Sequence, residues 1–359
     1  MSKRKDKFIT IGNEMKLKNI VIEDLDDIYY FESSKGLKTK TSKKLLEKGE
    51  ISQKSNIKLS KGRITEIHSN NAYKVKLQHE YKLCKLSGRL KYLAHETRTP
   101  ICTGDYVNID VTDPDNLRIE EIFDRKNTLS RFINYSERQE EVLIASNIDQ
   151  VVITVSCKEP DFNTHLIDRY LCAAEIFEIP AVICINKIDL LEDINEIKKQ
   201  CEYYDYIGYK IVYCSTKNHQ GMNELKHILK NKDSVFSGKS GAGKSSIINC
   251  LEPGLNLKTG EVSDFNSKGT HTTTYSRMIP WSFGGFLIDT PGIKTFGLKN
   301  EDIEKMRYCF PGFSILTDFC YFQNCTHTHE EDCAIKDNIN KTIPEDRYNS
   351  YLKIRESLC

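Results

Sequence analysis

The stretch GKSGAGKSS, residues 238–246, has the spacing of a phosphate-binding loop: Gly238, four residues, Gly243, Lys244 and Ser245. A strand-like SVF precedes it and a helix-like KSSIINCLE follows. Glycines let backbone N–H groups turn inward around phosphate oxygens, and the positive end of the following helix adds to the attraction. Lys244 is expected to reach the β- and γ-phosphates, and Ser245 to bind Mg²⁺. The predicted nucleotide contacts in this loop are Gly238, Lys239, Ser240, Gly241, Ala242, Gly243, Lys244, Ser245 and Ser246.

A guanine-reading motif stands upstream of this loop. NKID, residues 186–189, ends the apolar run IPAVICINKID, and α/β sheets place ligands at the carboxyl ends of such strands. Asp189 would accept hydrogen bonds from guanine N1–H and the 2-amino group, a donor pair that adenine lacks. Asn186 would brace neighbouring loops, and Lys187 would stack on the base. The next strand ends in CST, whose backbone N–H groups are candidates for guanine O6: Cys214, Ser215 and Thr216.

Two further stretches complete a predicted magnesium and γ-phosphate site. DTPG, residues 289–292, follows the apolar run GFLI. Asp289 would hold Mg²⁺ through water, and the Gly292 N–H would meet the γ-phosphate. KGTHTTT, between the loop and DTPG, is polar and β-branched, which is typical of a mobile switch that orders on γ-phosphate and Mg²⁺. Its candidate Mg²⁺ ligand is Thr273, with Thr272 as the alternative.

The order of these motifs is unusual, because in nucleotide switch proteins the phosphate loop is normally the first motif of the domain. From about residue 142, apolar strand-like runs alternate with helical spacing, which predicts a parallel sheet covered by helices on both faces. Each motif follows a predicted strand. Domain termini often lie close together, so joining the old ends and cutting elsewhere preserves the spatial site. The sequence therefore predicts an α/β P-loop GTPase domain with a circularly permuted motif order.

The composition is that of a globular chain. Its 359 residues allow two or three domains, and 39% are hydrophobic and 29% charged. The formal net charge of +1 does not by itself indicate a nucleic-acid binder. No apolar run approaches the ~20 residues of a membrane span. An odd total of 13 cysteines and no recognisable export signal argue against a disulfide framework, so we expect a cytoplasmic protein with no membrane contact.

The first 130 residues are predicted to form two parts. Residues 1–58 are expected to be a basic, flexible extension, because Lys35 to Lys58 contains eight lysines, two acids and little apolar surface. This extension is either a solvated tail or an arm that lies on RNA phosphates. Residues 59–130 contain five short strand-like runs separated by turns, which predicts a small β-barrel of the OB type. An SH3-like barrel is the structural alternative.

A second cluster of chemistry-bearing residues lies near the C-terminus, in CYFQNCTHTHEEDC. Cys320, Cys325, His327 and Cys333 supply three thiolates and one imidazole, the set of a closed tetrahedral zinc site. No ligand position is left for water, so the site is predicted to be structural. His329, two residues past His327, is the competing ligand. Zinc would order a segment with little apolar content of its own, and the flanking runs DIEKMRYCF and KIRESLC have helical spacing.

Together these motifs resemble those of the small ribosomal subunit biogenesis GTPase family, RsgA, also called YjeQ or YloQ. The resemblance spans about residues 60–350, and its matching stretches are NIDQVVITVSCKEPDFN, LIDRYL, NKIDL, SGKSGAGKSSIIN, GTHTTT, DTPGIKTFGL and the cysteine–histidine cluster. It implies an OB barrel at 59–130, a permuted GTPase domain at 131–298 and a mostly helical zinc-binding domain at 299–359.

The resemblance also implies an activity and its partners. These are GTP hydrolysis to GDP, stimulated by the 30S subunit during its late maturation, and contacts to 16S rRNA through the barrel and the zinc domain. It selects His327 over His329 as the fourth ligand of one structural zinc per chain. Mg²⁺ is expected to accompany GTP, and the chain is expected to be a monomer. The expected Mg²⁺ site is formed by Ser245, Thr273 and Asp289.

One departure from ordinary switch GTPases bears on the mechanism. Where those proteins carry a water-orienting glutamine after DTPG, this sequence has Ile293, which cannot hydrogen-bond. The resemblance supports His271 as the catalytic group that positions the attacking water. The family commonly has a basic residue before this histidine, whereas Thr270 stands here.

Three functional classes fit the motifs. The first is an RNA-stimulated GTPase on the ribosome, and the second is a nucleic-acid-binding adaptor that only senses GDP versus GTP. The third is an ATPase or kinase that shares the phosphate loop, and Asp189 argues against it.

Overall fold

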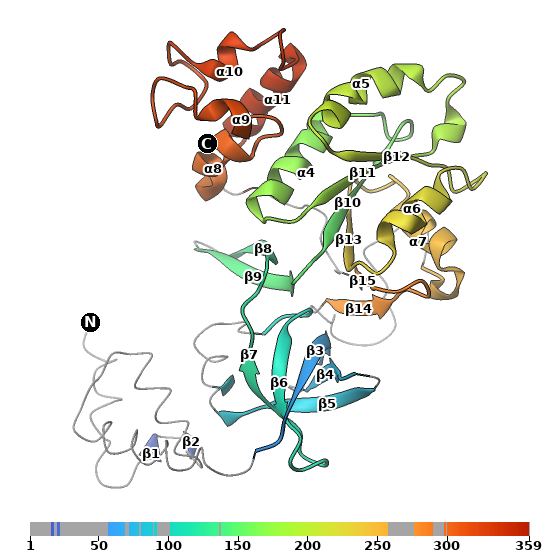
Figure 1. Cartoon of the computed structure of the whole chain (residues 1–359), viewed down its shortest axis with the longest axis vertical. Coiled ribbons are helices and arrows are strands. Elements are labelled where there is room, and N and C mark those ends of the chain that lie inside the picture. The colour runs from blue at the N-terminus through green and yellow to red at the C-terminus, as the bar shows by residue number, and fades with distance from the viewer. Residues whose placement is uncertain are drawn as a thin grey trace. The chain divides into compact units, whose positions relative to one another are not determined.

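The computed structural model shows two compact units, Met1–Asp124 and Arg125–Cys359 (Figure 1). For residues 131–135 and 138–142 only the backbone is described. Most of the predicted N-terminal extension lies outside the described residues, apart from the paired strands β1 (Lys16–Leu17) and β2 (Ile20–Val21). The structure describes residues 16–17, 20–21, 57–68, 72–78, 80–88, 90–91, 101–135, 138–257, 276–289, 298 and 300–358.

The first unit contains the five predicted strands. Each pairs with two others, in the order β3–β4–β5–β7–β6 and back from β6 to β3. All pairs are antiparallel except β5 with β7. Alternate side chains along these strands are buried and form one apolar core. The strands are β3 (Leu59–Ile67), β4 (Tyr73–Lys76), β5 (Tyr81–Leu86), β6 (Tyr106–Asp110) and β7 (Arg118–Ile122).

The second unit is built on a sheet in the order β12–β11–β10–β13–β15–β14. All neighbours are parallel except β14 with β15. The central strand β10 is buried along its whole length, as its unbroken apolar run predicts. The strands are β10 (Gln150–Ser156), β11 (Ala181–Asn186), β12 (Lys210–Tyr213), β13 (Ser234–Ser237), β14 (Arg277–Pro280) and β15 (Phe286–Asp289).

Helices cover both faces of this sheet (Figure 1). Helices α4 (Thr164–Ile176) and α5 (Asn195–Tyr206) pack on the face that carries Val151 and Ile153. Helices α6 (Met222–Leu229) and α7 (Lys244–Leu251) pack on the opposite face, against Val152. Short 3-10 turns follow at η1 (Ile188–Leu190) and η2 (Pro253–Leu255). The predicted alternation of strands and helices is confirmed.

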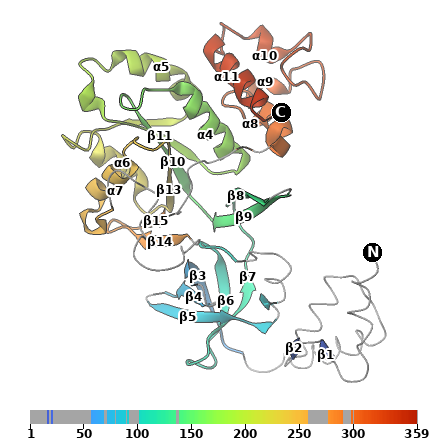
Figure 2. The same ribbon diagram turned by 180° about the vertical axis from the view of Figure 1, so that it is seen from behind.

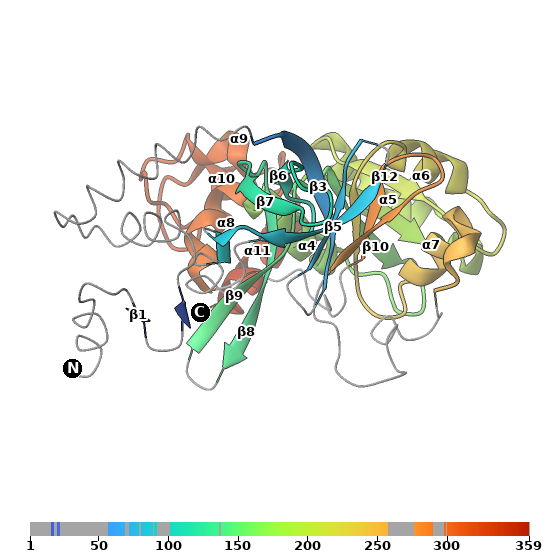
Figure 3. The same cartoon turned by 90° about the horizontal axis from the view of Figure 1, so that it is seen from below.

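A hairpin that was not predicted from the sequence precedes this sheet. Strands β8 (Thr128–Tyr135) and β9 (Arg138–Ser146) pair only with each other among the described strands, and run side by side in Figure 3. Asn127 fixes the base of the hairpin, because its side chain bonds both the N–H and the C=O of Ile148.

The C-terminal segment is helical and packs beside α4 and α5, as Figures 1 and 2 show. Its elements are η3 (Asn300–Asp302), α8 (Ile303–Cys309), α9 (Ser314–Thr317), α10 (Ala334–Asp337) and α11 (Glu345–Glu356). Phe310, Phe313 and Tyr351 belong to the same apolar core as α4. None of the described helices could span a lipid bilayer.

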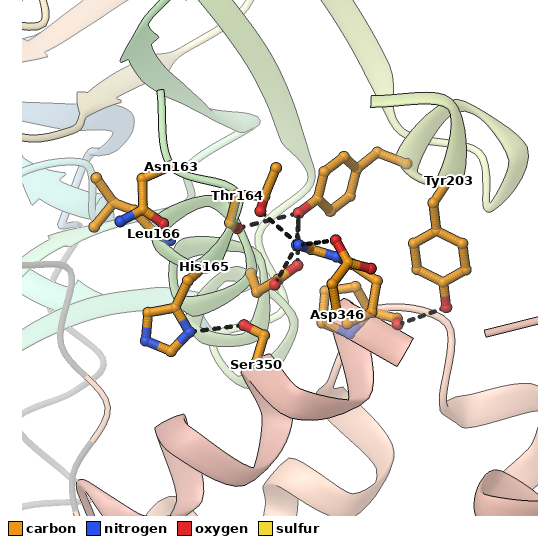
Figure 4. Close-up of polar contacts among 11 residues, drawn as sticks. Asn163, Thr164, His165, Leu166, Tyr203, Asp346 and Ser350 are labelled. Atoms are coloured by element: carbon orange, nitrogen blue, oxygen red, sulfur yellow. Dashed lines mark hydrogen bonds and ion pairs between the residues drawn. The ribbon is translucent and has the colours of Figure 1, made fainter. Parts of the chain in front are cut away.

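A buried polar network also joins α11 to α4 and α5 (Figure 4). Arg347 Nη1 lies 2.5 Å from Asp168 Oδ2, and both side chains are almost completely buried. Tyr204 donates to Asp168 Oδ1 at 2.7 Å and accepts from Arg347, which also bonds Thr164 Oγ1. Nearby, His165 Nδ1 lies 2.8 Å from Ser350 Oγ. Burial raises the pKa of Asp168, although the guanidinium opposes that shift.

Candidate functional site

Those of the predicted nucleotide residues that the structure describes lie at one edge of the parallel sheet. Strands β10, β11, β13 and β15 run in the same direction, so their carboxyl ends share that edge. Asn186 ends β11, Ser237 ends β13 immediately before the glycine-rich loop, and Asp289 ends β15. The permuted order therefore does not separate the described residues of these motifs in space.

The glycine-rich loop packs closely against two neighbouring strands. Gly238 has φ +144°, and a Cβ there would come within 2.1 Å of the Thr154 carbonyl oxygen. Gly243 has φ +93°, and a Cβ there would come within 2.2 Å of Asn186 Nδ2. Larger residues do not fit at either position, so the glycines set the curvature that a phosphate cradle requires.

Lys244 opens helix α7 and points back into this loop. Its Nζ donates to the carbonyl oxygens of Gly238 at 2.7 Å and Lys239 at 3.1 Å. The side chain is buried, and burial lowers the pKa of its ammonium. Ser245 is buried beside it, whereas Lys239, Ser240 and Gly241 are exposed and Ser246 is half-buried. A buried cation inside a glycine loop at a helix N-terminus is suited to a phosphate group.

Contacts between side chains and backbone connect the guanine motif to the loop. Asn186 Nδ2 donates to the Ala242 carbonyl at 3.0 Å, which is the bracing role expected from the sequence. Asp189 Oδ1 accepts from Ser215 Oγ at 2.5 Å, so the following CST stretch orients the carboxylate. Lys187 has φ +65°, a left-handed conformation that is uncommon for a lysine.

The CST residues differ in their backbone hydrogen bonds. The N–H of Cys214 donates to the Ile185 carbonyl at 2.8 Å, and that of Ser215 donates to the Gln220 carbonyl at 3.0 Å. These two N–H groups already have partners, which makes the N–H of Thr216 the best candidate for guanine O6.

The predicted metal ligands converge in the C-terminal helical segment. One ligand atom from each of Cys320, Cys325, His327 and Cys333 lies within 4.8 Å of the others. A tetrahedral zinc with Zn–S bonds of ~2.3 Å needs sulfurs roughly 3.8 Å apart, so the cluster is close to the required size. His329 is exposed and bonds Thr328 Oγ1, and it is not part of the cluster.

His327 is oriented for coordination. Its Nδ1 lies 3.6 Å from Cys320 Sγ and 3.4 Å from Cys333 Sγ, while Nε2 lies 3.3 Å from the Arg307 carbonyl. When Nε2–H donates to that carbonyl, the lone pair on Nδ1 faces the sulfurs. The residues present therefore fit a structural zinc ion.

Glu330 stabilises the loop that carries this histidine. It accepts hydrogen bonds from the backbone N–H groups of Thr326 and Thr328. Burial alone would raise the pKa of Glu330, but the hydrogen bond from the Thr326 hydroxyl, together with these backbone bonds, outweighs it and lowers the pKa to about 2.

Comparisons with known proteins agree with this geometry. The RsgA GTPase family model matches residues 122–299. The small ribosomal subunit biogenesis GTPase RsgA of Flavobacterium psychrophilum is 40% identical over 292 residues, which cover 79% of this chain and 89% of that protein. This chain belongs to the RsgA family. The RsgA of Phocaeicola vulgatus is 39% identical over 276 residues, covering 76% of this chain and 89% of the relative.

Solved structures of RsgA-family proteins show the same fold. The crystal structure of YjeQ from Thermotoga maritima is 31% identical with a TM-score of 0.69, and the match covers 84% of this chain and 99% of that one. The structure of YloQ, described as a circularly permuted GTPase, is 27% identical with a TM-score of 0.64 and coverages of 84% and 95%. The resemblance and the permuted fold expected from the sequence are thus confirmed.

The sequence analysis of this RsgA-family chain did not predict that the loop after β10 contacts the guanine motif. Cys157 follows β10, and its thiol donates to the Lys187 carbonyl at 2.9 Å. Lys187 Nζ in turn donates to the Glu159 carbonyl. The loop after β10 therefore holds the guanine-motif lysine at both ends. The place of Cys157 at the carboxyl end of the central strand is the sequence signal that points to this role.

Several predicted residues lie outside the described part of the chain. Their roles therefore stay predictions. These residues are His271, Thr272, Thr273, Gly292 and Ile293. Asp289 is described, and its Oδ2 lies 3.2 Å from Arg277 Nε.

Proposed function

We propose that this chain binds GTP and hydrolyses it to GDP and phosphate on the small ribosomal subunit during late maturation. Membership of the RsgA family supports the activity and the setting. The contact between Asn186 and Ala242 carries the proposal, because it joins the guanine motif to the phosphate loop across the permuted order. One nucleotide can then be held by its base and its phosphates together.

Phosphate release over many turnovers tests this function. The chain alone is expected to hydrolyse GTP slowly, and purified 30S subunits are expected to accelerate it. ATP in place of GTP is the control for the base. An equal rate with and without subunits would favour the adaptor that only senses the nucleotide.

The phosphate end of the site gives each residue a separate task. Lys244 would exchange its bonds to loop carbonyls for β- and γ-phosphate oxygens. Ser245, Thr273 and Asp289 would hold Mg²⁺, which supplies positive charge to the phosphates when bound with GTP. Asp289 would have to weaken its ion pair with Arg277 to do so.

Guanine selectivity is expected to depend on Asp189. In Asp189→Asn, the side-chain amide can donate to the carbonyl that xanthine carries in place of the 2-amino group. We expect GTP affinity to fall roughly 10- to 100-fold, the cost of losing a charge-assisted hydrogen bond, and xanthosine triphosphate affinity to rise. Titration with both nucleotides measures the change. Ser215→Ala, which removes only the orienting hydroxyl, is the matched control, and unchanged GTP affinity in Asp189→Asn would refute the assignment.

The first unit is proposed to be an OB barrel that contacts rRNA. Numbered along the chain, its strands pair as 1–2–3–5–4–1, which favours an OB barrel over an SH3-like one. Its surface pairs cations with partly exposed aromatic rings. The Arg63 guanidinium lies 4.7 Å from the Tyr106 ring centroid, and Lys74 Nζ lies 5.3 Å from that of Tyr81. Such pairs suit a negatively charged strand with stackable bases.

The zinc domain is proposed to hold one structural zinc per chain and to contribute to the subunit contact. We further propose a monomeric, cytoplasmic protein with no membrane partner. The basic extension at residues 1–58 stays a prediction. The domain boundaries after residues 130 and 298 also stay predictions.

Metal content tests the cysteine–histidine cluster. Elemental analysis is expected to give about one zinc per chain, and Cys325→Ser or His327→Ala is expected to lose it, because a site that loses one of its four protein ligands binds the metal more weakly. His329→Ala is the matched control and should keep the metal. GDP binding should survive in each variant, and full zinc content in a Cys320→Ser, Cys325→Ser double variant would contradict the site.

A further inference from the structure

The chain around Cys320, a residue of the metal cluster, exposes several large apolar side chains. Ile315 is 74% exposed, Phe319 76% and Tyr321 75%, and Phe322 is 44% exposed. Among the described residues only one other large apolar side chain, Tyr206 at 74%, is exposed by more than 70%. Scattered exposed side chains are normal, but several within eight residues of chain indicate a binding surface.

The backbone beneath this surface is held in place. Phe319 N–H donates to the Leu316 carbonyl at 3.0 Å, and Tyr321 N–H donates to the Asp332 carbonyl at 3.2 Å. The Tyr321 and Phe322 rings meet edge to face, with centroids 5.0 Å apart. The two rings also lie between the cluster residues Cys320 and Cys325 in the sequence. The backbone that carries these side chains is therefore held in place, which lowers part of the entropic cost of binding.

The chain segment that carries these side chains is acidic. Residues 308–335 contain four acidic residues and no lysine or arginine. Asp318 and Asp332 are exposed, and Asp332 lies beside Tyr321 through the backbone bond already described. Just before this segment, Arg307 is only 8% exposed and donates to the Gln323 carbonyl.

This pattern distinguishes between two kinds of partner. Binding to an RNA backbone requires cations that neutralise phosphates, and the surface offers carboxylates instead. A protein segment rich in arginine or lysine matches both features, because guanidinium groups stack on aromatic rings and pair with carboxylates.

We propose that Ile315, Phe319, Tyr321 and Phe322, with Asp318 and Asp332, form a docking face for a basic protein segment of the small ribosomal subunit. The location of the partner rests on the proposed function. The rRNA contact proposed for the zinc domain is then made by another of its faces.

Photo-crosslinking identifies what covers this face. The full chain carrying Phe319→p-benzoylphenylalanine is bound to 30S subunits with a non-hydrolysable GTP analogue and irradiated. We expect an adduct that resists ribonuclease and contains one basic protein. Tyr206→p-benzoylphenylalanine, equally exposed on α5, is the matched control and should not form that adduct. An adduct to rRNA, or no adduct at position 319, overturns the proposal.

Charge reversal gives an independent measurement. Asp318→Lys is expected to weaken co-sedimentation with 30S subunits about 10-fold, while zinc content and GDP affinity stay unchanged. Stronger binding by this variant would place the face on RNA phosphates and overturn the proposal, as would an unchanged affinity. Failure of the unaltered chain to bind subunits would instead count against the proposed function.

Discussion

His271→Ala is expected to leave GTP binding within about twofold and to reduce subunit-stimulated hydrolysis roughly 100-fold, the usual contribution of a positioned acid–base or water-orienting side chain. Ile293 cannot orient the attacking water, so another group has to do so. Phosphoryl transfer relies on preorganised geometry, and binding to a partner can supply that geometry. Single-turnover phosphate release with and without 30S subunits measures the effect.

Lys244→Ala provides the contrast that makes this result interpretable. Its buried ammonium faces the loop, so its loss is expected to weaken nucleotide affinity itself, roughly 10- to 100-fold for a charge-assisted contact. If His271→Ala kept full stimulation, a water held by backbone groups or by the ribosome would be the better account. If it lost GTP affinity as Lys244→Ala should, the histidine would belong to the binding site.

Arg347→Ala is expected to cost about 3–5 kcal/mol of the free energy of unfolding, because it leaves the Asp168 carboxylate buried without its partner. The damage should be centred where α11 meets α4 and α5. Urea unfolding followed by far-UV circular dichroism measures the loss in the free energy of unfolding. Hydrogen exchange then shows whether α11 is released first.

Two controls separate the effect of the buried ion pair from a general effect of changing helix α11. Lys353→Ala, at an exposed position on α11, should change stability by less than about 0.5 kcal/mol. Asp168→Asn combined with Arg347→Met should be less destabilised than the sum of the single changes, because no unpaired charge stays buried. Additive losses would show that the two side chains act separately.

The sequence predicted most of the local chemistry because that chemistry depends on spacing over a few residues. The separation of Gly238 from Gly243 and Lys244 describes one turn of backbone and the helix after it. The apolar run in β10 likewise predicted a buried strand. The same local logic missed the hairpin of β8 and β9.

Other features required the tertiary structure because sequence distance hides them. Whether the first unit favours an OB or an SH3-like barrel depends on strand order, which is set by pairing between distant segments. The spacing of His327 and His329 leaves both possible, although the family resemblance selects His327, and the structure shows His327 in the cluster and His329 exposed.

The sequence by itself determined which residues could bind phosphate, guanine and a metal, since each motif is a short pattern with its own backbone geometry. Only the tertiary structure decided which of them meet. Asn186 contacts Ala242, Cys157 contacts Lys187, and Asp168 pairs with Arg347 across 179 positions. Such contacts follow from burying several helices and strands around one core, a global balance of packing that no local pattern records.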